Sequence, residues 1–484
     1  MRIKTATSIA KLFTVGLFLF ISANTASAAS QPYQYTVNVA KNLSGLTVNA
    51  CFPGSMPQRL VSYDDAVRHL KSITLISGEK EKPLRPVERA VAVSTIKPGD
   101  CIRYEVNFRG KVTHPWFNKR QSKDQQVLVD IHRWLWFPDP FNTKQDAIDI
   151  TFKLPSGTSV STPWRLISQG NNSVTYRYEQ RPRDWEGRIA FGRFKIFERT
   201  IGKAKIHIAI LNGHPMVKQE AILQWVNKNL DALTMTYGDF PVPRLQLLVV
   251  PVGKDPEPVT WGQVMRGGGD AVHVYIDQTQ PLKDFLDDWV LIHELSHLLH
   301  PWIKGKDHWL YEGLASYYQN VLRARAGLLT PQQAWTKLHQ GFQRGVRNTP
   351  PHRTLAQVSE NMSHNKNFMR VYWSGAAIAL LADYKLRQQS DGQQSLDTAL
   401  DKLHQCCLPT LNLWEGLDLL KKLDEITGTE IFTGLYNQYI PSTRFPDVTG
   451  IYQKLGLTIE GKKLVLDNHA PAANIRKAIM SPTE

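Results

Sequence analysis

The sequence lacks several features that would place it in a specialised class of protein. It has no internal repeat and no low-complexity segment, so nothing indicates a repeat array or a disordered chain. No segment after residue 28 reaches the roughly 20 uninterrupted apolar residues of a membrane span. The formal net charge is +15, but lysines and arginines are dispersed among acids, so nucleic-acid binding is not expected. The 484 residues, 42% of them hydrophobic, suffice for two or three packed domains.

Residues 1–28 have the pattern of a secretory signal peptide. A basic start that ends at Lys11 leads into an apolar stretch from Leu12 to Ile21, and the small residues Ala26-Ser27-Ala28 follow. We expect cleavage before Ala29, and no cysteine follows the cut site to carry a lipid anchor. The sequence therefore predicts an exported protein, periplasmic or secreted, without an integral membrane segment after cleavage.

The chain has four cysteines, which in an exported protein are first considered as disulfide candidates. Cys51 and Cys101 are the natural pair, because both lie in a strand-rich region. A bridge between them would close a loop of about 50 residues and contribute roughly 3 to 4 kcal/mol. The adjacent Cys406 and Cys407 have three options, a vicinal bridge, other partners or free thiols, and the sequence does not choose.

Residue patterns predict an α+β multidomain chain. Short alternating runs such as 35–39 and 147–152, separated by Pro, Gly and Asn turns, indicate an antiparallel β-sandwich domain over 29–200. A small mixed sheet follows, with strands over 205–211, 245–252 and 271–276 and a helix over about 215–237.

Helical periodicity dominates after Pro281. We expect helices near 282–299, 311–326, 331–346, 370–388, 395–403, 413–426 and 430–439. Residues 328–445 are predicted to form a helical domain, and 446–484 a short tail with one strand at Lys463 to Leu466.

One short motif in the second half carries chemistry. His293-Glu294-Leu295-Ser296-His297 lies in an apolar helical segment, and residues four apart on a helix stand one above the other. The two imidazoles can therefore bind one zinc ion, while Glu294 stands beside the metal and can take a proton from the attacking water. A chance match is the competing interpretation, but it would leave charged groups in an apolar helix without partners.

A catalytic zinc site needs a third protein ligand and one open position. Glu312 is the best candidate, because it stands near the start of the next predicted helix, and a helical hairpin would return it to His293 and His297. Taken alone, Glu312 would be interpreted as an exposed acid at a helix start. His300 and His308 suit the role less, since His300 lacks the glycine spacing of H-E-x-x-H-x-x-G-x-x-H and His308 precedes the stronger Glu312 segment.

Together, the two segments resemble the gluzincin metallopeptidases, whose second zinc helix typically reads W-[LF]-x-E-G-x-[AT]-x-Y. Here the stretch from Trp309 to Tyr317 reads W-L-Y-E-G-L-A-S-Y. Within that clan the closer likeness is to the glycyl aminopeptidase family, because Tyr372-Trp373-Ser374-Gly375 is similar to its Tyr-x-Lys-Gly helix, with Ser374 in place of the usual lysine. The resemblance implies a thermolysin-like catalytic domain over 201–327 and one Zn²⁺ per chain. It also implies that Tyr372 donates a hydrogen bond to the oxyanion of the tetrahedral intermediate.

The same resemblance points to a substrate-binding segment upstream. Gly267, Gly268, Gly269 and Asp270 precede the predicted strand over 271–276 and are similar to the Gly-rich edge strand that binds substrate backbone in gluzincin aminopeptidases. Those enzymes place a glutamate after the glycines to bind the free amine, and Asp270 is the shorter acid at this position. A plain loop is the alternative interpretation.

The leading hypothesis is a zinc-dependent, aminopeptidase-like hydrolase that acts on peptide or protein substrates. Endopeptidase activity stays open, because only Asp270 is offered for amine binding. A non-catalytic peptide-binding envelope protein on the same scaffold is a hypothesis of another class. The interval between His297 and Glu312 is shorter than the family pattern predicts, and residues 446–484 are too few for its PDZ module, so substrate preference is not transferred. The sequence does not predict an oligomeric state.

Overall fold

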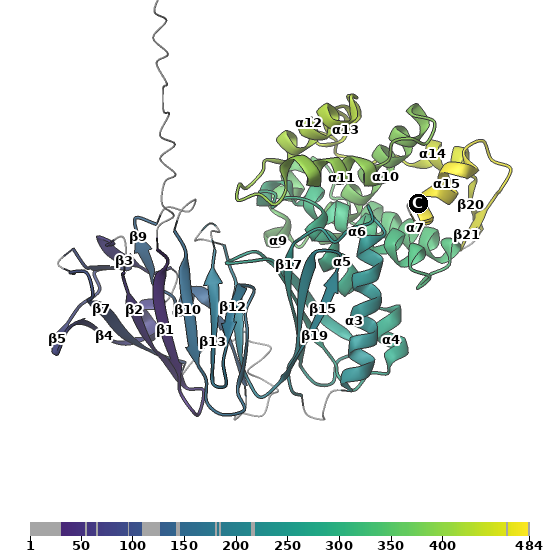
Figure 1. Ribbon diagram of the computed structural model, residues 1–484. Helices are drawn as coiled ribbons and strands as arrows, with labels where there is room; N and C mark the ends of the chain where they lie inside the picture. The colour runs from purple at the N-terminus through teal and green to yellow at the C-terminus, as the bar shows by residue number, and fades with distance from the viewer. Residues whose placement is uncertain are drawn as a thin grey trace, which may run out of the picture.

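The chain folds into N-terminal sheets, a mixed sheet beside them and a helical region above the mixed sheet (Figure 1). The computed structural model describes residues 31–482 except 54–55, 64–65, 95, 109–125, 142–145, 180–181, 183–184, 214–217 and 461–462. The predicted signal peptide lies outside the described residues. The predicted α+β multidomain class is confirmed.

The N-terminal region consists of short strands in layers that pack on one core. An eight-stranded sheet has the order β12-β13-β10-β1-β2-β7-β4-β5, and two three-stranded sheets have the orders β11-β14-β8 and β6-β3-β9. All pairs are antiparallel except β1 with β10, so the predicted sandwich contains one parallel pair. The elements are β1 (Tyr33–Val39), β2 (Gly45–Cys51), β3 (Arg59–Val61), α1 (Ala66–His69), β4 (Leu70–Ser77), β5 (Lys80–Pro83), β6 (Ala90–Ala92), β7 (Cys101–Asn107), β8 (Gln126–Asp130), η1 (Ile131–Arg133), β9 (Phe137–Asp139), β10 (Ile148–Lys153), β11 (Ser159–Ser161), β12 (Arg165–Gln169), β13 (Ser173–Tyr178) and β14 (Arg188–Gly192).

Both cysteine pairs form bridges. Cys51 of β2 stands directly opposite Cys101 of β7, with 4.3 Å between their Cα atoms, and the predicted disulfide is confirmed. Of the three options for the other pair, the structure has the vicinal bridge, which joins Cys406 and Cys407 at the end of α11 (Leu396–Cys407).

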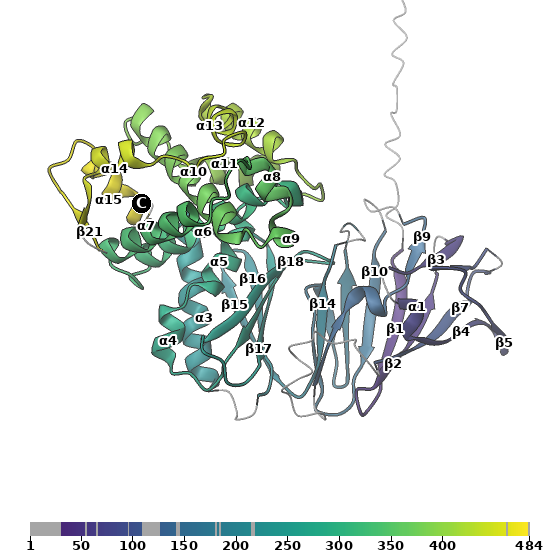
Figure 2. The ribbon, with the colours of Figure 1, turned by 180° about the vertical axis from the view of Figure 1, so that it is seen from behind.

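The mixed sheet has the order β15-β16-β17-β19-β18. Its strands are β15 (Lys195–Ile201), β16 (Ala204–Ile210), β17 (Arg244–Pro251), β18 (Val259–Met265) and β19 (Ala271–Ile276). From the sequence, the sandwich domain was predicted to end at residue 200 and the next domain to begin at residue 201. β15 nevertheless pairs with β16 over its whole length, so the mixed sheet begins at Lys195. One face packs on α3 (Gln219–Thr234) and other helices, and the opposite face packs on β8 and β14 (Figure 2). The β18 strand was not predicted.

The helix predicted over 282–299 is broken into three parts, α4 (Leu282–Asp287), α5 (Val290–Ser296) and η2 (His297–Leu299). The break lies at Asp288, whose backbone is extended with ψ 152°. The Asp288 carboxylate accepts a hydrogen bond from the backbone N–H of Val290 at 2.7 Å. This bond satisfies a free donor at the start of α5, so the break gives the motif helix its own beginning.

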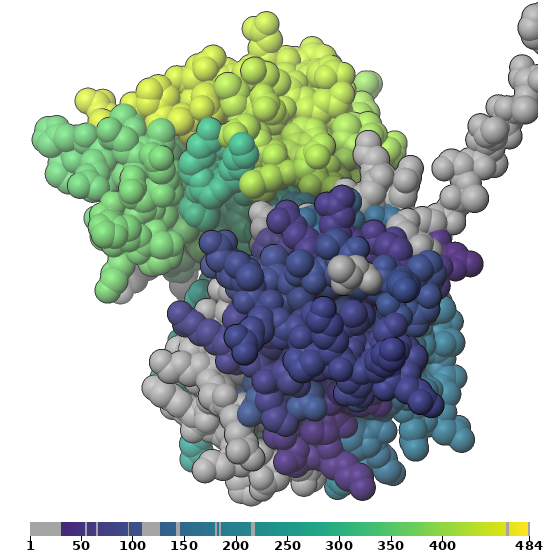
Figure 3. Space-filling model, turned by 90° about the vertical axis from the view of Figure 1, so that its left-hand side faces the viewer, coloured from purple at the N-terminus to yellow at the C-terminus, as the bar shows by residue number. Residues whose placement is uncertain are grey.

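The helical region follows the predicted periodicity closely. After η3 (Gly305–Asp307) its helices are α6 (His308–Arg325), α7 (Pro331–Arg347), α8 (Leu355–Glu360), α9 (Met362–Asn365), α10 (Phe368–Gln389), α11, α12 (Gly416–Thr427) and α13 (Ile431–Tyr439). The predicted short tail is more structured than expected, with α14 (Thr449–Leu455), a hairpin of β20 (Leu457–Glu460) and β21 (Lys463–Leu466), and α15 (Ala473–Met480). Within the described ranges, no helix is both long and apolar enough to cross a membrane. In space-filling view, the purple and blue N-terminal region faces the viewer, and the green and yellow helical region lies above it (Figure 3).

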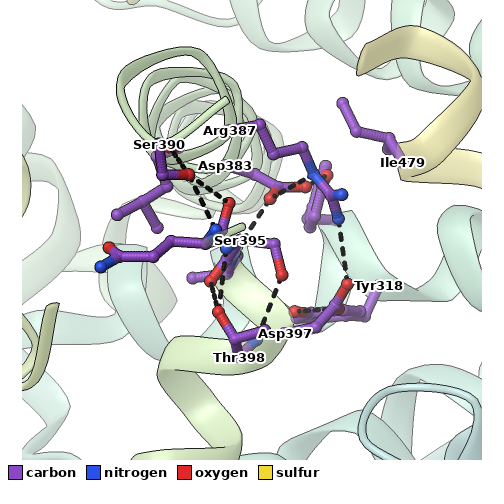
Figure 4. Close-up of polar contacts among 12 residues, drawn as sticks. Tyr318, Asp383, Arg387, Ser390, Ser395, Asp397, Thr398 and Ile479 are labelled. Carbon is purple, nitrogen blue, oxygen red and sulfur yellow. Dashed lines mark hydrogen bonds and ion pairs between the residues drawn. The ribbon is translucent and has the colours of Figure 1, made fainter. Parts of the chain in front are cut away.

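A buried ionic network ties the helical region together (Figure 4). Its charged members balance one another: Arg325 of α6, Asp383 and Arg387 of α10 and Asp397 of α11. The Asp397 carboxylate accepts from Arg325 at 2.8 Å, from Arg387 at 3.1 Å and from the Tyr318 hydroxyl at 2.9 Å. Arg325 also donates to the backbone carbonyl of Ile479 at 2.9 Å, so α15 is attached to α6. Because all these groups are buried, loss of one partner would leave an uncompensated charge.

Candidate active site

Three side chains with metal-ligating atoms meet where α5 and α6 face each other. α5 carries His293, and His297 follows one turn later on the same face. Oε2 of Glu312 on α6 lies 3.1 Å from Nε2 of His293 and 3.6 Å from Nε2 of His297. One potential ligand atom from each residue lies within 4.8 Å of the others. The structure therefore brings together the three residues that were predicted as ligands.

Neighbouring side chains orient the imidazoles. Nδ1 of His293 donates to Oε1 of Gln319 at 2.8 Å, which leaves Nε2 directed at Glu312. The His297 ring stacks on Tyr311, with ring centroids 4.0 Å apart. Neither Gln319 nor Tyr311 was predicted from the sequence. Gln319 had a usable signal, since it follows Glu312 by seven residues and so lies on the same face of α6.

Burial and mutual charge set the protonation of these groups. Burial lowers the pKa of His297 to about 4, which keeps its imidazole neutral. Burial also disfavours the charged form of His293, but the hydrogen bond and charge of Glu312 outweigh it and raise the His293 pKa. For Glu312 the effect of burial is outweighed by hydrogen bonds from both histidines, which hold its pKa well below the usual range. Two imidazole nitrogens and a carboxylate are a donor set that fits a zinc ion with one open position.

Glu294 lies beside the ligand group, against the edge strand β18. Burial raises the pKa of its carboxyl to about 7, although a hydrogen bond from the backbone N–H of Val264 favours the charged form. β18 passes so close that a Cβ at Gly262 would lie 2.6 Å from Cγ of Glu294. A glycine is therefore required at this point of the strand, and the position of the Glu294 side chain is restricted by the strand backbone.

Tyr372 reaches the site from α10, because α10 and α6 cross at a pair of glycines. A Cβ at Gly375 would lie 2.6 Å from Cα of Gly313 and 1.7 Å from the carbonyl oxygen of Trp309. Gly313 adjoins Glu312 and Gly375 stands one turn after Tyr372, so the close crossing brings the tyrosine hydroxyl near the Glu312 carboxylate. Burial, followed by the charge of Glu312, raises the pKa of Tyr372, so it stays protonated and able to donate.

The glycine segment that was predicted to bind substrate lies elsewhere. β19, which follows it, is an internal strand between β17 and β18, so the expectation of an edge strand there is wrong. A Cβ at Gly267, Gly268 or Gly269 would lie within 2.4 Å of an N-terminal-region atom, and the backbone N–H of Gly267 donates to the carbonyl of Glu186 at 2.7 Å. Asp270 is buried where β19 begins. These glycines allow two regions to pack closely, and the edge strand beside the site is β18.

Three other residues singled out from the sequence lie outside the ligand group. His300 is buried, and its Nδ1 donates to the carbonyl of Pro301 at 2.9 Å. His308 begins α6, one turn before Glu312. The Ser374 hydroxyl, which replaces the family lysine, donates to the carbonyl of Arg370 at 2.5 Å and accepts from its guanidinium. Ser374 therefore has a packing role inside the helical region.

A cavity of about 520 Å³ covers the ligand group. Its wall contains Glu294, Tyr372, residues 259–264 of β18 and two further acids, Glu257 and Asp288. Asp288 is buried, and burial raises its pKa to about 7. The segment 267–270 does not line this cavity. The acids in the cavity wall besides Glu294 and Glu312 are therefore Glu257 and Asp288, and Asp270 is not among them.

These parts define a class of protein. Two histidines one turn apart with a glutamate beside them, a glutamate on the next helix and an antiparallel edge strand against the first glutamate are the arrangement of a metallopeptidase site. Residues 301–388 match the family model of the M61 glycyl aminopeptidases, a segment that contains Glu312 and Tyr372. The resemblance to gluzincin metallopeptidases, and most of all to the glycyl aminopeptidase family, is confirmed.

Solved structures share the fold of this chain. An aminopeptidase N family protein from Idiomarina loihiensis superposes with a TM-score of 0.69 over 88% of this chain and 79% of its own, at 14% identity. A yeast LTA4 hydrolase superposes with a TM-score of 0.52 over 86% of this chain and 68% of its own, at 12% identity. At these identities the likeness shows the fold. A comparison with curated protein sequences gave no match.

Proposed function

We propose that the chain is an exported, zinc-dependent hydrolase of peptide bonds with aminopeptidase-like action. One observation carries the proposal: two histidines, two glutamates and a tyrosine converge on a single cavity, namely His293, His297, Glu294, Glu312 and Tyr372. Export is supported by the signal-peptide pattern of residues 1–28 and by the Cys51–Cys101 disulfide, because such bridges persist in oxidising compartments.

Each catalytic group has a position that suits its step. Zinc held by the two histidines and Glu312 would supply a Lewis acid for the scissile carbonyl. Glu294 accepts the proton of the attacking water and passes it to the leaving amine. The Tyr372 hydroxyl donates a hydrogen bond to the oxyanion that develops on the carbonyl.

The substrate backbone is expected to bind along β18. This strand is the free edge of the mixed sheet beside Glu294, and an extended peptide can add to such an edge through main-chain hydrogen bonds. Glu257 and Asp288 are the acids available to bind a free α-amine. An endopeptidase would not need that contact, so amine recognition separates the two modes of cleavage.

The first test concerns the base. Glu294→Gln is expected to keep about one zinc per chain and to lower turnover of any cleaved peptide by roughly 10²-fold to 10⁴-fold, because the amide cannot accept the proton. Metal analysis and single-peptide kinetics measure the two effects. Glu79→Gln, in the exposed turn between β4 and β5, is the matched control. Near-parental turnover of Glu294→Gln would reject the proposed base, and absence of zinc and of peptide hydrolysis from the parent would favour a non-catalytic scaffold.

The second test concerns the cleavage mode. One peptide is offered with a free and with an acetylated amino terminus, with and without a chelator, and products are identified by mass spectrometry. An aminopeptidase should leave the blocked peptide intact, whereas equal cleavage of both would indicate an endopeptidase. The mass of the mature amino terminus in the periplasmic or extracellular fraction tests export.

A further inference from the structure

A second cavity of about 400 Å³ adjoins the metal site. Trp289 and Tyr372 line both this cavity and the one that covers the ligand group. Gln319, which accepts the hydrogen bond from His293, also stands in its wall. A substrate whose scissile bond lies beside Tyr372 can therefore extend a neighbouring group into this cavity.

The wall of the second cavity carries three cations and no acid. Arg323 comes from α6, and Lys337 and Arg344 come from α7. Within the described part of the chain, none of the three forms an ion pair with a carboxylate. The Arg344 guanidinium lies 4.9 Å from the ring centroid of Trp373, which leaves its charge unneutralised. The cavity therefore has a positive potential next to the metal site.

Arg323 is the most informative of the three. Its side chain is 1% exposed, and Nη2 donates to the backbone carbonyl of Asp287 at 2.5 Å. Its Nε is buried and has no acceptor among the described residues. Burial and the charges of Arg323 and Arg344 outweigh the opposing charge of Asp287 and lower the pKa of Lys337. Asp287 and Asp288 lie near enough to act on the charge of Arg323, but neither acid lines this cavity. Three cations in a wall that contains no acid make an anionic ligand favourable.

The rest of the wall limits the kind of anion. Ser316, Asn320 and Gln340 supply neutral polar groups, and Met369, Trp289 and Trp373 supply apolar surface for methylene groups. A carboxylate at the end of a short aliphatic stem matches both. We propose that this cavity is a substrate subsite that binds a carboxylate on a residue flanking the scissile bond, either an acidic side chain or the terminal carboxylate of a short peptide. The proposal rests on the proposed peptidase function.

The experiment uses isosteric peptide pairs with the full mature chain. Glu or Gln is placed on either side of the cleaved bond, and dipeptides are compared with free and amidated carboxyl ends. We expect kcat/KM to be roughly 10-fold to 100-fold higher for the charged member at one of these positions, as is usual for charge-assisted hydrogen bonds. A preference confined to the Glu pairs identifies a side-chain subsite, and one confined to the free dipeptides identifies a terminal-carboxylate subsite.

Binding is measured separately by calorimetry on metal-free protein with the same pairs. The charged peptide should again bind roughly 10-fold more tightly. If no peptide is hydrolysed but this difference persists, the proposed function fails and the subsite stands. Equal affinities together with equal kcat/KM values would overturn the subsite alone.

Two variants assign the effect to the cavity. Lys337→Met and Arg344→Gln are chosen because these side chains are at least partly exposed, whereas Arg323 is fully buried. In the double variant Lys337→Met, Arg344→Gln, the kcat/KM and the affinity for the charged peptide should fall toward those for its neutral partner. The control Lys477→Met, on the exposed face of α15, should keep the parental preference for the charged peptide. A full parental preference in the double variant would overturn the proposal.

Discussion

Replacement of Gly375 by alanine is expected to separate α6 from α10 and to disable the site without touching a reacting group. The added Cβ would lie 1.7 Å from the carbonyl oxygen of Trp309, whereas real Cβ contacts are essentially never under 3.0 Å. The helices must therefore separate locally by about 1.3 Å. Neither neighbour can yield as a flexible side chain would, because the nearest atoms belong to the backbones of Trp309 and Gly313.

This separation acts on the two residues of the proposed active site that flank the crossing. Glu312 adjoins Gly313, and Tyr372 stands one turn before Gly375, so the distance between them changes by about the same amount. A displacement near 1 Å can cost about 10²-fold in rate. Overpacking of a core contact costs about 1 to 3 kcal/mol. Gly375→Ala should therefore lower kcat/KM by about 10²-fold and lower the thermal midpoint.

The assay compares kcat/KM, zinc content and thermal midpoint with those of Gly434→Ala. Gly434 is also a helical glycine, in α13, but a Cβ there would meet nothing within 4 Å. This control should be neutral or more stable by up to about 1 kcal/mol, because alanine is the better helix former. If Gly375→Ala has parental activity and stability, the glycine crossing does not position Tyr372 and the reasoning is wrong.

Three further predictions follow from the site. Tyr372→Phe should keep zinc and fold but lower turnover by roughly 10²-fold to 10³-fold, because the oxyanion loses a donor; parental kinetics would assign that role to another group. Gln319→Leu should weaken zinc affinity by about 10-fold to 100-fold in a competitive chelator titration, because His293 loses the acceptor that orients its ring; unchanged affinity would contradict this. Burial raises the pKa of Asp288 to about 7. Between about pH 4 and pH 7 the folded chain therefore holds a proton on Asp288 that the unfolded chain releases. The free energy of unfolding consequently falls as pH rises through that window. The Asp288→Asn side chain does not titrate. Measured in chelator, the unfolding free energy of this variant minus that of the parent should therefore rise by a few kcal/mol from pH 5 to pH 8. A difference that does not vary with pH would refute the raised pKa.

Elements with a strong local signal were predicted well from the sequence. α7 begins at Pro331 as expected, because Thr330 and Gln333 form a capping box, and α10 exceeds its predicted range by only two residues at one end and one at the other. The convergence of His293, His297 and Glu312 was also predicted, because histidines four apart and a glutamate near the start of the next helix are local patterns. The break at Asp288 was missed, since the apolar periodicity continues through it and the capping bond depends on one side-chain orientation.

The strand that is proposed to bind substrate was not predicted, and the reason lies in what glycines report. Glycines are required wherever backbones approach closely, and the sequence does not say whether the approaching backbone belongs to a substrate or to another part of the chain. Gly267 to Gly269 approach the N-terminal region, whereas the single Gly262 approaches Glu294. A run of three glycines is the more conspicuous pattern, but the isolated glycine in a strand is the one beside Glu294. Only the strand order, which depends on pairing between distant segments, distinguishes the two.

The cations of the second cavity also could not be predicted from the sequence, because they are distant from one another along the chain. The lysines and arginines are dispersed along the chain, and dispersed charge is correctly expected to be solvated at most positions. Arg323, Lys337 and Arg344 are spaced by 14 and 7 residues, so no sequence window contains a basic cluster. They converge because α6 and α7 pack side by side and present these positions to one cavity. The cations of the proposed subsite are therefore defined by their place in a cavity wall that contains no acid, which no composition or local pattern reports.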